Sequence, residues 1–250
     1  MYHVYKNGYS TLPNLKKLQA IEVFEKNKPD SELIKIEKEE ALKNQKYFFE
    51  YNNPQEFYEI CEQFIIENYP NKLNSSKYIN IVKETEEDFL IHRIDDDKDY
   101  LSSAHVCFAS HWLPEEKIGT SFNEIHKPVP MNLKNSKKLV EAMIYGGMFE
   151  RFVWSVIYEK RYNFHPRLSY KKFDKNNPQV HIKVERQVTV GFPEKNFCLF
   201  VLRQYLIDEK ELDKPSLINA IKTMTPEQKK YKSLEDCEDL IGYLLTTTIL

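Results

Sequence analysis

The stretch that decides the fold is residues 180–207, VHIKVERQVTVGFPEKNFCLFVLRQYLI. Its first half alternates apolar and polar residues from Val180 to Val190, which is the period of a β-strand. After the turn-like residues 191–196, a second run from Phe197 to Ile207 is apolar at most positions. Strands joined by so short a connection pair in opposite directions, so the sequence predicts a long antiparallel hairpin.

Two arginines interrupt the apolar face of this hairpin. Arg186 shares the parity of the apolar residues on the first strand, and Arg203 does the same on the second. If the loop has an even number of residues, opposed positions differ in parity, so both guanidinium groups fall on one face. Arginine stays protonated inside proteins and needs anions there. These anions are either internal Glu or Asp carboxylates or a ligand that carries carboxylate or phosphate groups.

The rest of the chain supplies helices and further short strands. Apolar spacing and helix-start signals predict helices at 31–45, 54–69, 136–148 and 216–224, one starting at Thr225-Pro226, and one at 234–245. Short apolar runs predict strands at 78–82, 89–94 and 152–157. This order is typical of an α+β domain with an antiparallel sheet and flanking helices. We expect an N-terminal arm and helices (residues 1–75) packed on an α+β domain (residues 76–250) as one structural unit.

Composition argues against several classes of partner. The 36 basic and 38 acidic residues nearly cancel, so no overall field attracts the chain to nucleic acid or to a membrane surface. The first residues, MYHVYKNGYS, lack the pattern of a signal peptide. No apolar run approaches the roughly 20 residues that span a bilayer. The sequence therefore predicts a soluble, cytoplasmic protein.

Short motifs of catalysis and cofactor binding are missing from the sequence. It has no C-x-x-C pair, no G-x-S-x-G and no P-loop, and its six glycines form no G-x-G-x-x-G. A zinc knuckle, a disulfide framework and a Rossmann-bound nicotinamide or flavin are therefore not expected. The cysteines are expected to be reduced and buried: Cys61, Cys107, Cys198 and Cys237. Any electrons for a redox reaction must come from another protein.

Residues 106–130, VCFASHWLPEEKIGTSFNEIHKPVP, are the densest in side chains able to do chemistry. Pro114 suits the first turn of a short helix. Residues 121–124, SFNE, then offer a capping box that restarts a helical pattern after Gly119. His126 lies at the margin of the apolar stripe of that helix, and Pro128 ends the helix.

His126 admits three interpretations, namely a structural histidine, a metal or haem ligand, and a general base. No second histidine stands three or four residues away on the same helix, which excludes a two-histidine metal site there. A single histidine between apolar residues, with arginines available for propionates, fits haem better than zinc. His111 is the second choice for the same role.

Several short matches in the same order resemble one known family, the haem-dependent oxidative N-demethylase α subunit. The departures are Ala109, where the family usually has proline, His111, where it often has arginine, and the pair Val188-Thr189. The matching pieces are Glu87-Asp88, Cys107-Phe108, Ser110, Trp112, residues 116–119 (EKIG), Ile125-His126 with residues 128–130 (PVP), Trp154-Ser155, residues 184–187 (VERQ), Arg203 and Tyr231-Lys232.

The resemblance implies a PAS-like haem-binding domain, in which an antiparallel sheet and helices enclose haem b. It also implies that a small methylated amine is oxidised by dioxygen, with release of formaldehyde. Electrons would come from a separate NADPH-dependent reductase partner that carries flavin and iron–sulfur groups. The protein's share would be the axial ligand, a dry pocket and the orientation of the amine.

Residue roles follow from this hypothesis. His126 is the expected iron ligand, Arg186 and Arg203 are expected at the propionates, and Trp112 is a further cofactor-binding residue. A cationic amine calls for a carboxylate or aromatic faces, for which chemistry alone suggests Glu185, Trp154 and Tyr145. The alternative interpretation of Glu185 is a structural one, in which it pairs with a neighbouring Lys or Arg.

Two other functions stay open on the sequence. A PAS-like domain can bind haem as a sensor or carrier without turning it over. A third hypothesis is a small-molecule binding protein that kept the fold without haem. The chain contains no kinase, cyclase or DNA-binding output module, which argues against a sensor.

Overall fold

A seven-stranded antiparallel sheet forms the centre of the computed structural model, which describes residues 4–10, 14–25, 31–130 and 136–247. The strand order is β1-β5-β6-β7-β3-β4-β2. The strands are β1 (Lys16–Lys17), β2 (Phe48–Glu50), β3 (Asp88–Asp95), β4 (Lys98–His105), β5 (Met148–Ile157), β6 (His181–Phe192) and β7 (Phe197–Ile207).

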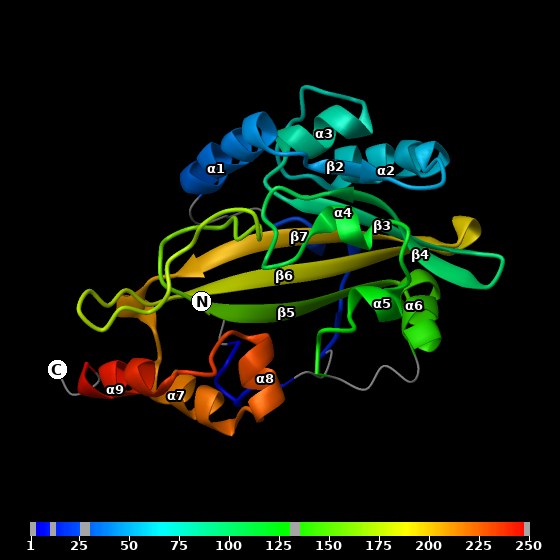
Figure 1. The fold of residues 1–250 in the computed structure, drawn as a ribbon. Coiled ribbons are helices and arrows are strands. Elements are labelled where there is room, and N and C mark those ends of the chain that lie inside the picture. Colours follow the sequence, from blue (N-terminus) through cyan, green and yellow to red (C-terminus); the bar gives the residue numbers. More distant parts are fainter. Residues whose placement is uncertain (1–3, 11–13, 26–30, 131–135, 248–250) are drawn as a thin grey trace.

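In Figure 1, α1, α2 and α3 lie above the strands and α7, α8 and α9 lie below them. The expected α+β class is therefore confirmed. Short 3-10 turns occur at η1 (Ala20–Glu22), η2 (Pro193–Lys195) and η3 (Glu209–Glu211). The α-helices are α1 (Ser31–Asn44), α2 (Gln55–Asn68), α3 (Tyr78–Glu84), α4 (Pro114–Lys117), α5 (Phe122–Ile125), α6 (Ser136–Tyr145), α7 (Lys214–Thr223), α8 (Pro226–Tyr231) and α9 (Glu238–Thr246).

The predicted hairpin is the β6–β7 pair, and its register places Arg186 directly opposite Arg203. The turn closes through η2 and Asn196, whose φ of 54° is the left-handed conformation that asparagine tolerates. The two faces of β6 differ in chemistry. We call the side with Arg186 and Arg203 the arginine face, and the side with Lys183 and Glu185 the cavity face.

The arginine face carries most of the apolar core. Val188 and Val190 pack with residues of α2 and α3, such as Phe57 and Ile81. Further along β6, Ile182 and Val184 pack with residues of α7 and α9. On the cavity face, Leu90 and Leu202 pack against side chains of the segment that follows β4, including Trp112 and Ile125. Residues 106–130 therefore cover the second side of the sheet.

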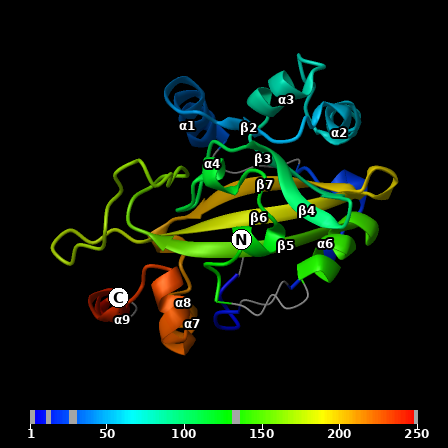
Figure 2. The same cartoon turned by 45° about the vertical axis from the view of Figure 1, so that its right-hand side comes forward.

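One glycine lets α6 approach β6 closely. A Cβ atom at Gly191 would lie 2.2 Å from the backbone oxygen of Ile144, closer than any real contact. The last turn of α6 therefore packs directly on the backbone of β6, and Figure 2 shows α6 beside this end of the sheet. This contact requires glycine at position 191.

One sequence expectation needs correction and a second needs an addition. Residues 78–82 were predicted as a strand, but they begin α3, because Tyr78, Ile81 and Val82 are buried at the i, i+3, i+4 spacing of a helix. The N-terminal part was expected to supply an arm and helices, and it also supplies β1 and β2, which pair with β5 and β4 at the two edges of the sheet. Within the expected arm, residues 1–3, 11–13 and 26–30 lie outside the described residues.

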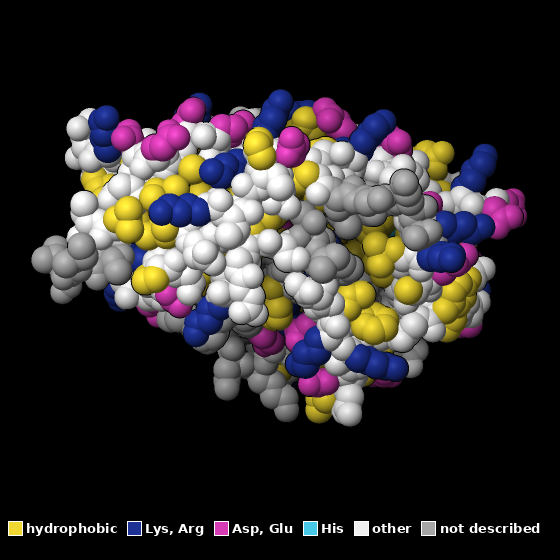
Figure 3. Space-filling model, turned by 90° about the horizontal axis from the view of Figure 1, so that it is seen from below, with side chains coloured by type: hydrophobic (Ala, Val, Ile, Leu, Met, Phe, Trp, Pro, Cys, Tyr) yellow, Lys and Arg dark blue, Asp and Glu magenta, His cyan; other side chains and the backbone are white. Residues whose placement is uncertain are grey.

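The surface agrees with the balanced charge of the sequence. Seen from below in Figure 3, basic and acidic side chains are interspersed among hydrophobic ones. Among the described residues, none of the helices has both the length and the apolar character needed to cross a bilayer.

Candidate functional site

A cavity of about 1810 Å³ is lined by the cavity face and the segment that follows β4, and also by parts of the N-terminal segment, of residues 164–173 and of residues 227–239. Pockets of roughly 300–1,000 Å³ hold drug-sized ligands, so this one is large enough for a bulky cofactor together with a small molecule. Its apolar walls include Leu90, Leu101, Trp112, Ile125, Phe200 and Leu202. Its polar lining includes Ser110, His126, Arg151, Lys183, Glu185, Gln187 and Lys232.

His126 lies in this cavity with one ring nitrogen fixed. The helix α5 starts at Ser121, whose Oγ accepts the backbone N–H of Glu124 at 3.2 Å, and His126 follows its last residue. Nδ1 lies 2.8 Å from the carbonyl oxygen of Phe122. Since a carbonyl can only accept, Nδ1 carries the proton. The ring also stacks on Phe122, with 4.0 Å between ring centroids.

The other nitrogen of His126 is therefore the one available to a ligand. Nε2 holds a lone pair, and it has no hydrogen-bond partner within the described part of the chain. Burial lowers the pKa of His126 to about 4, so the imidazole is neutral near pH 7. A neutral imidazole whose first nitrogen donates to a backbone carbonyl is the arrangement that metal-ligating histidines use.

A row of hydrogen-bonded side chains crosses the cavity face next to this histidine. Arg151 Nε donates to Gln187 Oε1 at 2.7 Å. Gln187 donates in turn to Glu185 Oε1, and Gln204 Nε2 donates to Glu185 Oε2 at 2.8 Å. The carboxylate of Glu185 is thus held by two neutral amides, with no ion pair to a Lys or Arg among the described residues. Arg151, Lys183 and Lys232 act electrostatically on this carboxylate, so a cation in the cavity would share it with them.

Two lysines complete the polar lining. Lys183 is buried, and its Nζ donates to Ser110 Oγ at 2.8 Å and to the carbonyl oxygen of Phe108 at 3.2 Å. Burial lowers the pKa of Lys183 to about 8. Lys232 Nζ donates to the carbonyl oxygen of Trp154 at 2.6 Å. These lysines tie the loop after β4 and the end of α8 to the sheet.

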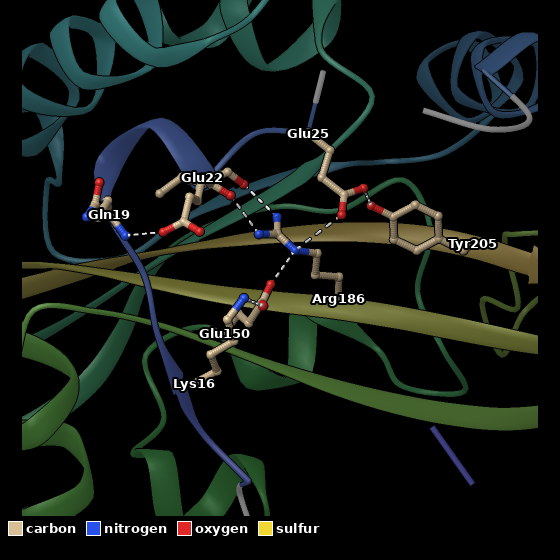
Figure 4. Close-up of polar contacts among 8 residues, drawn as sticks. Lys16, Gln19, Glu22, Glu25, Glu150, Arg186 and Tyr205 are labelled. Atoms are coloured by element: carbon tan, nitrogen blue, oxygen red, sulfur yellow. Dashed lines mark hydrogen bonds and ion pairs between the residues drawn. The ribbon is translucent and has the colours of Figure 1, made fainter. Parts of the chain in front are cut away.

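The two hairpin arginines lie outside this cavity. Arg186 lies on the arginine face, and Figure 4 shows its contacts. Its Nε lies 2.7 Å from Glu150 Oε2, and its terminal nitrogens donate to the carbonyl oxygens of Val23 and Glu22. Arg203 forms an ion pair of 2.7 Å with Glu86. The expected placement at ligand propionates is corrected, because internal carboxylates pair with both arginines.

The remaining predicted residues are spread over different places. Trp112 lines the cavity, and its role as a cofactor-binding residue stays a prediction. His111 also lines the cavity, with its side chain exposed and packed against the rings of Phe164 and Tyr170. Trp154 pairs with Val184 and so lies on the arginine face, and residues from both faces of β5 line the cavity. Tyr145 is exposed, lies outside the cavity and donates to Asn196. Glu185 and Trp154 therefore do not face one another.

Arg151, Lys183 and Lys232 were missed by the sequence reasoning. Lys183 belongs to the polar half of an alternating strand, which normally faces water. Here that face is covered by residues 106–130, so the polar half of β6 lines the cavity. A sequence signal did exist, because Lys232 and Ser110 both belong to the matched pieces.

A family model described as haem-dependent oxidative N-demethylase, alpha subunit-like matches residues 62–241. This match covers more than half of the chain. The chain belongs to this family. The oxidative N-demethylase α-subunit-like region includes every strand that borders the cavity, together with His126 and Glu185. A search of curated proteins found no significant match.

Proposed function

We propose that this chain is a haem-binding oxygenase subunit that oxidatively N-demethylates a small methylated amine. The observation that carries the proposal is the free Nε2 of His126 in a large cavity of a protein from this family. A PAS-like arrangement, in which the sheet and the segment after β4 enclose the haem, is part of the proposal. Trp112, Phe200 and Leu202 offer the apolar surface that a porphyrin ring requires.

The donor set of the cavity fits haem. His126 Nε2 is a nitrogen ligand of the type that holds haem iron. Haem also carries two carboxylates, and the cavity offers cations to receive them. Arg151 has one hydrogen-bond acceptor among the described residues, Gln187, so its terminal nitrogens can donate to a carboxylate. Lys232 also lines the cavity. We assign the propionate role to Arg151 and Lys232, because Arg186 and Arg203 are already paired with carboxylates.

The amine would be oriented by Glu185. A methylated amine is cationic near neutral pH, and the carboxylate of Glu185 lines the cavity with no ion pair to a Lys or Arg among the described residues. Leu90 and Phe200 exclude water from the apolar part of the same cavity. Bound haem would supply dioxygen activation. In the overall reaction one oxygen atom leaves in formaldehyde with the N-methyl carbon, and the other becomes water. The two electrons would come from a separate NADPH-dependent flavin and iron–sulfur partner.

Haem titration tests the first part of the proposal. The purified protein should bind one haem with a Soret band typical of histidine ligation, and His126→Ala should change that band. His111→Ala is the matched comparison, because His111 also lines the cavity and is the alternative ligand, and its loss is expected to leave the band unchanged. If the Soret band of His126→Ala equals that of the wild type and the band of His111→Ala differs from it, His111 is the iron ligand instead.

Turnover tests the second part. Formaldehyde should appear when the haem protein receives a methylated amine, dioxygen and a reductase. If haem binds but no amine in a panel is demethylated, the chain is a haem-binding sensor or carrier. If the protein refuses haem altogether, the proposal fails and a haem-free binding protein remains.

A further inference from the structure

A buried cluster of three metal-ligating side chains lies apart from the cavity. Asp88 begins β3, His105 ends the neighbouring strand β4, and Cys107 follows two residues later. One potential ligand atom from each of them lies within 4.8 Å of the other two. All three residues are buried, and none of them lines the cavity. The proposed haem chemistry does not use these groups.

His105 is the residue that points to a missing ligand. Its exposed fraction is 0%, and neither ring nitrogen has a hydrogen-bond partner among the described residues. The ring is packed against the aromatic side chains of Tyr47 and Phe48. A buried polar group without a partner loses its hydrogen bonds to water and gains none in return, so such groups are rare in folded proteins. A metal ion bound to one nitrogen would offset part of this loss.

Asp88 is held in the orientation of a ligand. Its Oδ1 accepts the backbone N–H of Cys107 at 2.8 Å, and its Oδ2 accepts the backbone N–H of Phe108 at 2.9 Å. Each carboxylate oxygen keeps a further lone pair. Hydrogen bonds of this kind fix ligating carboxylates in metal sites. They also bring the Cys107 backbone to the carboxylate, so two of the three ligands are already tied together.

The charges around the cluster can accommodate a divalent ion. Lys38 is buried, donates to the carbonyl oxygens of Thr85 and Glu87 at 2.7 Å each, and acts electrostatically on Asp88 and Cys107. Burial raises the pKa of the Cys107 thiol to about 12, against the opposing effect of Lys38, so a metal ion must displace the thiol proton to form the thiolate. The carboxylates of Asp88 and Glu87 together with this thiolate then balance Lys38 and one divalent ion.

We propose that Asp88, His105 and Cys107 bind one Zn²⁺ ion. Thiolate sulfur, imidazole nitrogen and carboxylate oxygen are the donors that zinc uses in proteins, and a fourth position remains for water. The ion joins the ends of β3 and β4 to the segment that continues to Ser110. Ser110 in turn accepts a hydrogen bond from Lys183 at the cavity. The zinc ion therefore stabilises the segment that carries Ser110, which lines the cavity.

Cobalt substitution tests the site in the native chain. Haem-free protein, purified without a metal-binding tag and stripped with a chelator, is titrated with Zn²⁺ and then with Co²⁺. We expect one equivalent of zinc per chain and a thiolate-to-cobalt charge-transfer band. Cys107→Ser should abolish the band and weaken zinc binding by more than the roughly 10–100-fold that loss of an outer-sphere partner costs. Cys198→Ser, which removes a buried cysteine outside the cluster, should keep both.

Several results would overturn the proposal. They are a native chain that takes up no stoichiometric zinc, a cobalt spectrum without the charge-transfer band, and a band that survives in Cys107→Ser. The native spectrum decides the question even if Cys107→Ser does not fold. His126→Ala should leave the cobalt spectrum unchanged, and a spectrum lost in that variant would place the ion in the cavity instead. Because the titration uses haem-free protein, its outcome is independent of haem binding.

Discussion

Arg186 Nε lies 2.7 Å from Glu150 Oε2, and both side chains are almost fully buried on the arginine face of the sheet. The terminal nitrogens of Arg186 also hold the backbone of the N-terminal segment at Glu22 and Val23. The ion pair thus joins β5 to β6, and the hydrogen bonds of Arg186 join β6 to η1 and the residue after it. Glu150 also pairs with a second basic residue, Lys16, whose Nζ lies 3.1 Å from Glu150 Oε1. Lys16 is far more exposed than Arg186.

Removal of the Glu150 carboxylate is expected to destabilise the protein strongly. Glu150→Ala leaves the Arg186 guanidinium buried with a more distant carboxylate, Glu25 at 3.8 Å. Loss of one partner of a buried pair costs about 3–5 kcal/mol in the free energy of unfolding. Lys16→Ala removes a partner that is 66% exposed and should cost less than about 1 kcal/mol. Urea unfolding measures both, and equal losses would contradict this account.

Two glycine substitutions should act in opposite directions. Gly191→Ala places a Cβ 2.2 Å from the backbone oxygen of Ile144, so α6 must move away from β6. Overpacking of this kind costs about 1–3 kcal/mol or more. Gly242 lies inside α9 with nothing within 4 Å of the added Cβ, so Gly242→Ala should stabilise by about 0.5–1 kcal/mol. Thermal or urea unfolding compares them, and a harmless Gly191→Ala would show that the contact is looser than described.

His126 should make the protein less stable in acid. Burial lowers its folded pKa to about 4, below the ordinary value of 6.5, so the unfolded chain binds the extra proton first. This contribution is fully present above pH 6.5 and is lost as the pH falls to about 4, by up to about 3 kcal/mol. His126→Gln cannot titrate. Between neutral pH and pH 4, the wild type should therefore lose more unfolding free energy than His126→Gln. Equal losses in the two proteins would contradict the lowered pKa.

Glu185→Gln should weaken amine binding and leave haem binding intact. The amide keeps the size of the side chain but removes the charge that we assign to the cationic substrate. A hydrogen bond to a charged group contributes about 1.5–3 kcal/mol, which corresponds to a rise in KM of roughly 10–100-fold. Tyr145→Phe is the control, because Tyr145 is exposed and outside the cavity. Equal KM values for wild type and Glu185→Gln, with turnover present, would remove the assignment.

Much of the fold could be predicted from local patterns. The alternation in residues 180–207 predicted β6, β7 and their pairing, because the period of two is a property of the strand itself. The apolar stripes predicted α2 and α6 for the same reason. Parity alone placed Arg186 and Arg203 on one face. Where a short run fits both periods, as at residues 78–82, local pattern could not choose, and packing of Tyr78 and Ile81 against α2 made it a helix.

The sequence by itself determined the hairpin, the α+β class, the family and the position of His126 at the end of a short helix. Tertiary structure decided which carboxylate each arginine meets, because Glu150 and Glu86 come from distant parts of the chain. It also decided that the polar side of β6 faces a cavity instead of water, because residues 106–130 cover it. A strand's alternation defines two faces, but only the segments packed on them determine which one is buried.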